Sequence, residues 1–278
     1  MMQIEVLLAI RRDDAARYYR QLAQHREFHL NVVTEAAETL ESLGDRERRF
    51  DVVVIDNRLP DAFELIDEIR HTYPRLLIVL IDEDADFALP GQADEVSIEP
   101  FENDDLARRI VRMMSDRQLE TLRADTMPAV REFAKQLRKV SNAGEYGKQQ
   151  AAVSACTALG YDYVAFYRID TDGHIMLRAQ DGDTPAQMAA PKEAAADDIV
   201  SWVAKTEQSR IAGPDDTLNH PLVVRGRLGA LAAVPVKQKY GVLVAGRKAP
   251  GSISQENVIM LELVSAQLAA AVSKDSLG

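Results

Sequence analysis

The feature that most constrains the fold is the stretch of residues 51–61, which reads DVVVIDNRLPD. Four consecutive apolar residues, from Val52 to Ile55, predict a strand that is buried on both faces, as in a parallel sheet. The strand ends at Asp56, and the NRLPD that follows has the composition of a turn. Because open α/β sheets place their sites at the carboxyl ends of central strands, Asp56 is expected at a functional site.

The segments around this stretch alternate between strand and helix patterns. Apolar runs predict strands, and each of the first three strands is followed by a helical pattern. No periodic helix stands out between the last two strands. This alternation predicts a doubly wound parallel α/β sheet. The expected strands are residues 4–10, 28–34, 50–56, 76–81 and 95–98, and the expected helices are residues 15–22 (capped by Asp13 or Asp14), 36–43 and 62–71.

An apolar strand that ends in Asp56, followed by Leu59-Pro60-Asp61, resembles the phosphoacceptor segment of response-regulator receiver domains. The resemblance covers residues 1–118 and implies a flavodoxin-like fold. It also implies an acidic pair after the first strand that holds Mg²⁺, a Ser or Thr after the fourth strand, and a Lys before a Pro after the fifth. These are the residues on which phosphorylation of the aspartate depends in that family.

The polar site departs from this pattern at every position except Asp56. The departures are Arg11 and Arg12 at the acidic pair, Ile81 (followed by Asp82) at the hydroxyl position, and Glu99 (before Pro100) at the lysine. Mg²⁺ prefers carboxylate oxygens, which guanidinium groups do not supply. A carboxylate at position 99 also repels a phosphoryl group. The sequence therefore predicts a degenerate receiver without bound Mg²⁺, without metal ligands and without catalytic residues.

The charge changes at positions 11, 12 and 99 are reciprocal, and three arrangements are compatible with them. Arg11 or Arg12 lies between Asp56 and Glu99 and neutralises both carboxylates, or both arginines point to solvent. In the third arrangement the register shifts, and Asp13 or Asp14 supplies a metal ligand. A buried ion pair of the first kind is weak evidence of stability, because desolvation offsets its Coulomb energy.

Residues 119–143 are expected to form a helical linker with an apolar stripe that Pro128 interrupts. Apolar residues on a helix between two domains are exposed unless another surface covers them. Two coverings are considered. The first is a parallel homodimer through the linker and the terminal helices, and the second is packing onto the chain's own second domain.

The second half of the chain changes to a pattern of helix, hairpin, helix, antiparallel strands and helix. The hairpin turns at Thr171-Asp172-Gly173. This order, together with the C-terminal stretch GVLVAGRKAPGSISQENVIMLELVSAQLAAAV, resembles a GAF domain, an α+β fold assigned to residues 127–278. The expected helices are residues 146–159, 197–206 and 255–272, and the expected strands are residues 161–170, 174–179, 218–224, 228–236 and 240–246.

The GAF resemblance implies a pocket for an unidentified small ligand or a dimerising module. No cofactor is identified by the sequence. Cys156 is expected in the core and not at a site of cofactor attachment. Each ligand-binding candidate can also be explained without a ligand. An aromatic residue can pack in the core, and the other side chains can be solvated or hydrogen-bonded within the protein. The candidates are Phe166, Arg178, Trp202 and His220.

Charge and composition narrow the classes of function. The net charge of −11 falls on residues 1–118, which hold 15 Lys and Arg against 26 Asp and Glu, whereas residues 119–278 hold 18 of each. Neither half predicts the basic face that duplex nucleic acid requires. No apolar run approaches the ~20 residues of a membrane span. The single cysteine fits a reducing compartment, so a cytoplasmic protein without membrane insertion is expected.

These features predict a bacterial signal-transduction regulator that is not an enzyme. A receiver-like domain is coupled to a GAF sensory or dimerisation domain and acts through contacts with itself and with a signalling protein. Two alternatives stay open. One is a response regulator that is phosphorylated on Asp56, and the other is an assembly scaffold whose GAF domain is filled by side chains.

Overall fold

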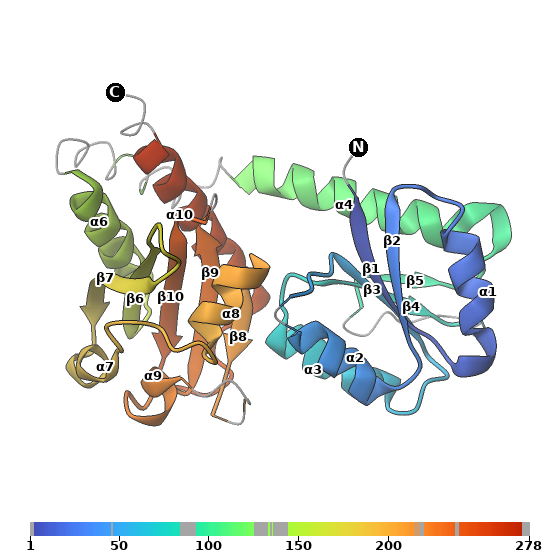
Figure 1. Ribbon diagram of the computed structural model, residues 1–278, viewed down its shortest axis with the longest axis horizontal. Coiled ribbons are helices and arrows are strands. Elements are labelled where there is room, and N and C mark those ends of the chain that lie inside the picture. The colour runs from blue at the N-terminus through green and yellow to red at the C-terminus, as the bar shows by residue number, and fades with distance from the viewer. Residues whose placement is uncertain are drawn as a thin grey trace. The chain divides into compact units, whose positions relative to one another are not determined.

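The computed structural model describes residues 3–45, 47–83, 93–124, 133, 135, 144–214, 216, 220–236 and 239–273, with the side chains of residues 118–124 left aside. The chain divides into two compact units, Met1–Glu120 and Thr121–Gly278 (Figure 1). Each unit has its own sheet and its own buried core, and each is described by itself.

The N-terminal unit is built on a five-stranded parallel sheet in the order β2-β1-β3-β4-β5. The central strand β3 is buried along its whole length, as its unbroken apolar run predicts. The predicted strands are confirmed, with ends that differ by one or two residues. The strands are β1 (Ile4–Ala9), β2 (Phe28–Val33), β3 (Val52–Asp56), β4 (Leu77–Ile81) and β5 (Glu95–Ser97).

Helices cover both faces of this sheet (Figure 1). On one face, α1 (Arg12–Leu22) and α4 (Asp105–Ala124) pack their apolar stripes on alternate residues of the strands, such as Val6, Val54 and Val79. On the other face lie α2 (Ala36–Gly44) and α3 (Ala62–Thr72), which are neighbours of each other. A short 3-10 turn, Glu102–Asp104, precedes α4.

The predicted linker is described only in part. Helix α4 continues from the N-terminal unit as far as Ala124, and the predicted break at Pro128 lies outside the described residues. Phe133, which belongs to the predicted apolar stripe, is buried in the core of the C-terminal unit. At this residue the stripe packs on the chain's own second unit, which was the alternative to a dimer contact.

The C-terminal unit is built on a five-stranded antiparallel sheet in the order β7-β6-β10-β9-β8. Helices α6 (Gly144–Ala158) and α10 (Gln255–Ser273) pack on one face around a large apolar core. Helix α8 (Ile199–Thr206) contacts β8, β9 and β10, and two short helices, α7 (Thr184–Ala189) and α9 (Pro221–Val224), are adjacent to each other. The strands are β6 (Tyr163–Ile169), β7 (Ile175–Gly182), β8 (Arg210–Ala212), β9 (Ala230–Val236) and β10 (Gly241–Arg247).

A buried lysine joins the two long helices of this unit. Lys148 of α6 is 3% exposed, and its Nζ donates a hydrogen bond of 2.9 Å to the carbonyl of Ala271 in the last turn of α10. The last carbonyls of a helix lack partners within the helix, and a cation is favourable there. Lys148 therefore satisfies the end of α10 from a neighbouring helix.

One predicted strand, residues 218–224, is wrong. Residues 221–224 form helix α9, with Pro221 in its first turn and His220 as its N-cap, and residues 217–219 lie outside the described residues. Proline lacks the N–H that a strand ladder requires, and it is favoured at the start of a helix. The place at the sheet edge is taken by β8, which the sequence did not predict.

Helix α10 is the one helix of the described residues that is long and apolar enough to cross a membrane, by length and composition. Many of its apolar residues pack into the core of the C-terminal unit. Val258, Leu261 and Leu268 are fully buried in the cluster that joins α10 to the sheet.

Candidate functional site

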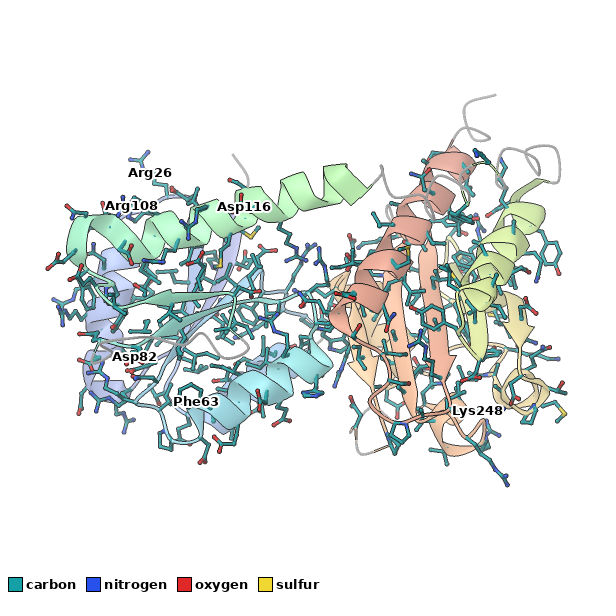
Figure 2. The ribbon with its side chains drawn as sticks, turned by 180° about the vertical axis from the view of Figure 1, so that it is seen from behind. Arg26, Phe63, Asp82, Arg108, Asp116 and Lys248 are labelled. Carbon is teal, nitrogen blue, oxygen red and sulfur yellow. The ribbon has the colours of Figure 1, made fainter. Side chains whose placement is uncertain are left out.

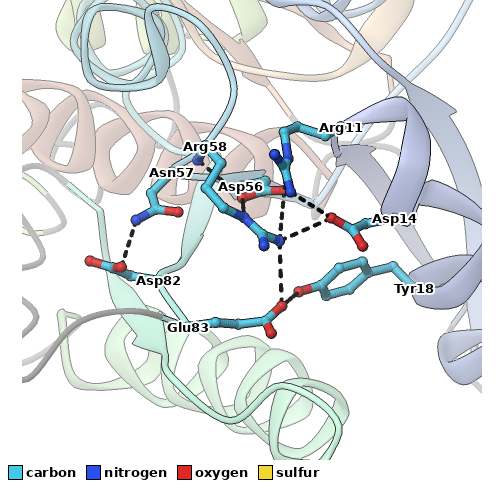
Figure 3. A network of polar contacts seen from close by, with 8 residues as sticks. All are labelled: Arg11, Asp14, Tyr18, Asp56, Asn57, Arg58, Asp82 and Glu83. Atoms are coloured by element: carbon cyan, nitrogen blue, oxygen red, sulfur yellow. Dashed lines mark hydrogen bonds and ion pairs between the residues drawn. The ribbon is translucent and has the colours of Figure 1, made fainter.

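The candidate site of the N-terminal unit is centred on Asp56 at the carboxyl end of β3. The side chain of Asp56 is completely buried. Because β1 and β4 flank β3 in parallel, the segments that follow all three strands meet at this edge of the sheet (Figure 3). The prediction that Asp56 lies at the carboxyl end of a central parallel strand is confirmed.

The cation that holds Asp56 is Arg58, two residues further along the same turn. Its Nε lies 3.0 Å from Oδ1 of Asp56, and its Nη2 lies 3.3 Å from Oδ2. The backbone N–H of Arg58 donates to Oδ1 as well, at 3.0 Å. These bonds raise the pKa of the Arg58 guanidinium, against the opposing effect of burial. The buried carboxylate is therefore paired in the two-point geometry that arginine provides.

Two further carboxylates converge on the same guanidinium. Nη2 of Arg58 is 3.2 Å from Oδ2 of Asp14 in α1 and 3.5 Å from Oε1 of Glu83, just after β4 (Figure 3). The hydroxyl of Tyr18 donates to Oε1 of Glu83 at 2.5 Å. Burial, followed by this bond to Glu83, raises the pKa of Tyr18. Arg58 thus occupies the middle of a ring of three carboxylates from three different segments.

The two arginines that replace the acidic pair have different positions. Nη2 of Arg11 is 3.0 Å from Asp14, and its Nε is 3.8 Å from Oδ2 of Asp56. Arg12 is exposed. Arg11 therefore lies at the edge of the network, whereas Arg12 points to solvent.

The predicted bridge from Asp56 to Glu99 is not formed. Glu99 is exposed and has no side-chain partner among the described residues, and Pro100 after it is buried. The reason is that Arg58 already satisfies Asp56 from the same turn. Glu99 follows β5, which is separated from β3 by the whole of β4.

The segment after β4 is fixed to the turn after β3 by two bonds. The carbonyl of Ile81, at the predicted hydroxyl position, accepts a hydrogen bond from the backbone N–H of Asn57. Nδ2 of Asn57 donates to Oδ1 of Asp82 at 2.5 Å, so Asp82 is bonded to Asn57 and not to Asp56 (Figure 3). Ile81 is buried and offers no hydroxyl. Asp82 is therefore part of the scaffold that shapes the turn.

The structure shows where Asp13 and Asp14, the two possible metal ligands of the third arrangement, are placed. Asp14 does reach the site, but its carboxylate is shared between Arg11 and Arg58, and Asp13 is exposed. Within the described residues, no group of three or more His, Cys, Asp or Glu side chains is placed to hold a metal ion. The residue that the sequence reasoning missed is Arg58, a cation in the turn next to the buried acid.

The four ligand candidates of the C-terminal unit do not form one site. Phe166 faces the α6–α10 core, whereas Trp202 and His220 are fully buried outside that core cluster. Arg178 is exposed at the irregularity where β7 shifts its register against β6. The aromatic neighbours of Phe166 on β6, Tyr163 and Tyr167, are also fully buried and are not members of the α6–α10 cluster.

His220 is buried beside Asp198, the N-cap of α8. Nδ1 of His220 accepts the N–H of Leu222, and Nε2 lies 3.8 Å from Oδ2 of Asp198 without a hydrogen-bond partner in the described part of the chain. Burial lowers the pKa of His220 to about 4. Burial also raises the pKa of Asp198, although the backbone N–H groups of Ser201 and Ala195 oppose that change.

Cys156 is completely buried in α6, and burial raises the pKa of its thiol to about 12. A thiol with such a pKa is protonated at neutral pH and is a poor nucleophile. The expectation that Cys156 is a core residue is confirmed.

Comparison with known families identifies the second unit. The model of the GAF domain matches residues 149–272, and this part of the chain is a GAF domain. The match begins within α6 and ends within α10, so it includes the whole antiparallel sheet. No curated protein matches the chain.

Solved structures that resemble the chain contain GAF domains of several proteins. The GAF domain of an Acinetobacter phosphoenolpyruvate-protein phosphotransferase is 19% identical, with a TM-score of 0.41, over 54% of this chain and 94% of that one. The phycoerythrobilin-bound GAF domain of a cyanobacterial phytochrome is 19% identical, with a TM-score of 0.43, over 54% and 95%.

The chromophore-binding domain of the R. palustris bacteriophytochrome RpBphP3 is 15% identical, with a TM-score of 0.41, over 53% of this chain. The chain spans 62% of the length of that domain. Likenesses at these TM-scores assign neither a ligand nor an activity to this chain.

Proposed function

We propose that the chain is a bacterial signal-transduction regulator in which a receiver-like unit is coupled to the GAF domain. The receiver-like unit works without Mg²⁺-dependent phosphorylation, and the chain acts through protein contacts and not as an enzyme. It binds neither nucleic acid nor Mg²⁺ and works in the cytoplasm. Its partners are a second copy, through the linker and terminal helices, and a signalling protein.

The topology of the N-terminal unit supports its assignment as receiver-like. The strand order β2-β1-β3-β4-β5 is typical of flavodoxin-like folds and supports this assignment, in which the switch point lies between β1 and β3. Asp56 ends β3 at this point. The acid, the strand order and the Leu59-Pro60-Asp61 turn together favour a receiver origin for this unit.

The observation that carries the proposal is the position of Arg58. A phosphorylatable aspartate needs free carboxylate oxygens and a cation that also binds the incoming phosphoryl group. Here both oxygens of Asp56 accept bonds from Arg58, and the nearby carboxylates of Asp14 and Glu83 neutralise the same guanidinium. A cation of the chain itself therefore lies on the acid, which supports a unit that works without Mg²⁺.

The test is incubation with phosphoramidate and Mg²⁺, followed by intact-mass spectrometry. The expected result for the wild type is no gain of a phosphoryl group, with or without Mg²⁺. A stoichiometric gain in the wild type that is lost in Asp56→Ala would overturn the proposal in favour of the phosphorylated response regulator. Arg58→Ala shows whether the arginine itself blocks the reaction, and Arg12→Ala is the matched control because Arg12 is exposed.

A second candidate is an assembly scaffold without a GAF ligand. It is favoured by the complete burial of Tyr163, Tyr167 and Trp202, which are large side chains outside the α6–α10 core. Native mass spectrometry of the freshly purified chain separates the two roles of the GAF domain. A dimer with added small-molecule mass supports a sensor, whereas a dimer at the bare chain mass supports the scaffold.

A further inference from the structure

The exposed surface of α2 and α3 has a group of carboxylates that no described cation pairs with. Five carboxylates are exposed on these neighbouring helices, and none of them forms an ion pair within the described part of the chain. Among the described arginines near these helices in the sequence, Arg48, Arg49 and Arg70 pair with Asp45, Asp51 and Asp94 instead. The five carboxylates are Glu38, Glu41, Glu64, Asp67 and Glu68.

An aromatic side chain stands within this acidic surface. Phe63 of α3 is 53% exposed, between the buried residues Ala62 and Leu65 that attach the helix to the sheet. Asp67 lies four residues on and is therefore its neighbour on the helix surface, while Glu64 is its neighbour in the sequence. A large aromatic ring surrounded by charged groups of one sign is the composition of an interface anchor with a polar rim.

The other helix-covered face of the same sheet is different. On α1 and α4, exposed arginines such as Arg12 and Arg108 are mixed with exposed acids such as Asp116, and the exposed Arg26 follows the end of α1. Figure 2 shows Arg26, Arg108 and Asp116 on one side of this unit and Phe63 on the opposite side. The N-terminal unit is acidic as a whole, but its exposed acids are mixed with exposed arginines on α1 and α4 and not on the α2–α3 surface.

The ion network of the site holds α3 in place. The turn that precedes α3 is fixed by the bond between the N–H of Leu59 and the carbonyl of Asp56, and by Arg58 on the Asp56 carboxylate. Leu59 is buried in the same turn. The position of Phe63 in the first turn of α3 is therefore set by the turn that Arg58 and Asp56 hold together.

We propose that the α2–α3 surface is the docking site for a cationic segment of a partner protein, with Phe63 as its apolar anchor. Charge complementarity identifies the partner, because five unpaired carboxylates attract Lys and Arg and repel anionic lipid. A second copy is disfavoured as the occupant of this surface, because residues 1–118 of that copy are acidic and residues 119–278 have no net positive charge to offer. The proposal rests on the proposed function, in which the chain acts through protein contacts.

The experiment measures binding of a fluorescein-labelled amphipathic helical peptide of Lys and Leu to the full chain by anisotropy. Phe63→Ala removes the anchor without changing the charge, and we expect binding about tenfold weaker, the equivalent of ~1.4 kcal/mol. Glu64→Gln with Asp67→Asn removes two carboxylates from the surface, and we expect binding about fivefold weaker at low salt.

The matched control is Glu102→Gln with Asp116→Asn, which makes the same change in net charge near α4, where both side chains are exposed. We expect this control to change the affinity less than about twofold. The docking site is overturned if the control weakens binding as much as the α3 variant, or if Phe63→Ala binds as the wild type does. It is also overturned if sedimentation equilibrium shows self-association that Phe63→Ala abolishes.

The docking experiment and the phosphorylation experiment can fail independently of each other. Phosphorylation of wild-type Asp56 would overturn the metal-free mechanism and leave the docking result intact. Loss of the docking site would leave the phosphorylation result intact. Circular dichroism of each variant confirms that the helices are retained, which is expected because all the substituted side chains are exposed.

Discussion

Asp56 in the N-terminal unit and Asp198 in the GAF domain are both buried carboxylates, with exposures of 0% and 1%, but they are compensated differently. Asp56 is paired with the guanidinium of Arg58, whereas Asp198 accepts backbone N–H bonds from Ala195 and Ser201 at the start of α8. A nearby histidine, His220, stays at 3.8 Å. The first acid therefore depends for its compensating charge mainly on the side chain of Arg58, although the Arg58 N–H also donates to it, and the second depends on the backbone that folds around it.

This difference has energetic consequences. Removing one partner from a buried ion pair leaves an isolated charge, which costs several kcal/mol, although the intact pair contributes little net stability. A carboxylate at a helix N-cap keeps its backbone donors as long as the helix is formed. We therefore expect the N-terminal site to be sensitive to single substitutions of its cation and the GAF site to be sensitive to pH.

The largest effect is expected for Arg58→Ala, which should destabilise the N-terminal unit by about 4 kcal/mol because Asp56 stays buried without its cation. Combining it with Asp56→Asn should restore most of the stability. Urea unfolding followed by circular dichroism measures the change. Trp202, the single tryptophan of the chain, reports the unfolding of the GAF domain separately by fluorescence.

The control for this prediction is Arg12→Ala, which removes an exposed arginine at the start of α1. It should change the free energy of unfolding by less than about 0.5 kcal/mol. If Arg58→Ala unfolds at the same urea concentration as this control, the contrast between the two sites does not hold.

The next effect is a loss of GAF stability in acid that depends on His220. The pKa of His220 is about 4 in the folded protein and 6.5 ordinarily, so between these values the unfolded chain binds a proton that the folded chain does not. The free energy of unfolding therefore falls as the pH drops from 6.5 toward 4, by on the order of 3 kcal/mol.

Asp198 acts in the opposite direction in acid. Its pKa is raised in the folded state, so the folded protein takes up that proton more readily than the unfolded chain as the pH falls. Trp202 fluorescence in urea at pH 7 and pH 4.5 measures the sum of both contributions. His220→Asn keeps an acceptor for the N–H of Leu222 and should have the smaller pH slope, so equal slopes in the two proteins would contradict the assignment.

The smallest effect is expected for Tyr18→Phe, which removes the hydroxyl that bonds Glu83 and keeps the ring that contacts Phe101. The N-terminal unit should lose about 1.5 kcal/mol, the lower end of the usual contribution of a hydrogen bond to a charged group, because Tyr18 is buried but Glu83 is partly exposed. Tyr19→Phe is the matched control, since Tyr19 is its exposed neighbour. A loss of equal size in the control would show that the hydroxyl of Tyr18 contributes nothing specific.

The sequence predicted the N-terminal sheet well because its central strands β3 and β4 are apolar runs, VVVI and LIVLI, that end at turn residues. Residues 218–224 were misassigned because an apolar stretch was weighed above Pro221, which favours the start of a helix. The edge strand β8 has three residues, too few to produce a periodic signal.

The site was predicted at Asp56, but its cation was not. Charge reciprocity pointed to Arg11, Arg12 and Glu99, whereas the turn conformation after β3 brings Arg58 back onto the acid. In the GAF domain, period-two alternation places Phe166 and Tyr167 on opposite faces of β6. It does not say which face is covered by the long helices, and this decides that Phe166 belongs to the α6–α10 core.

The bond between Lys148 and the carbonyl of Ala271 has a mechanical consequence. Sliding α6 past α10 would separate the ammonium group of Lys148, which is 3% exposed, from this acceptor, and the cost of a buried charge that loses a hydrogen bond opposes such a motion. Helices α6 and α10 are therefore expected to move together as one rigid unit. A torque applied to α6 is then delivered at the far end of α10.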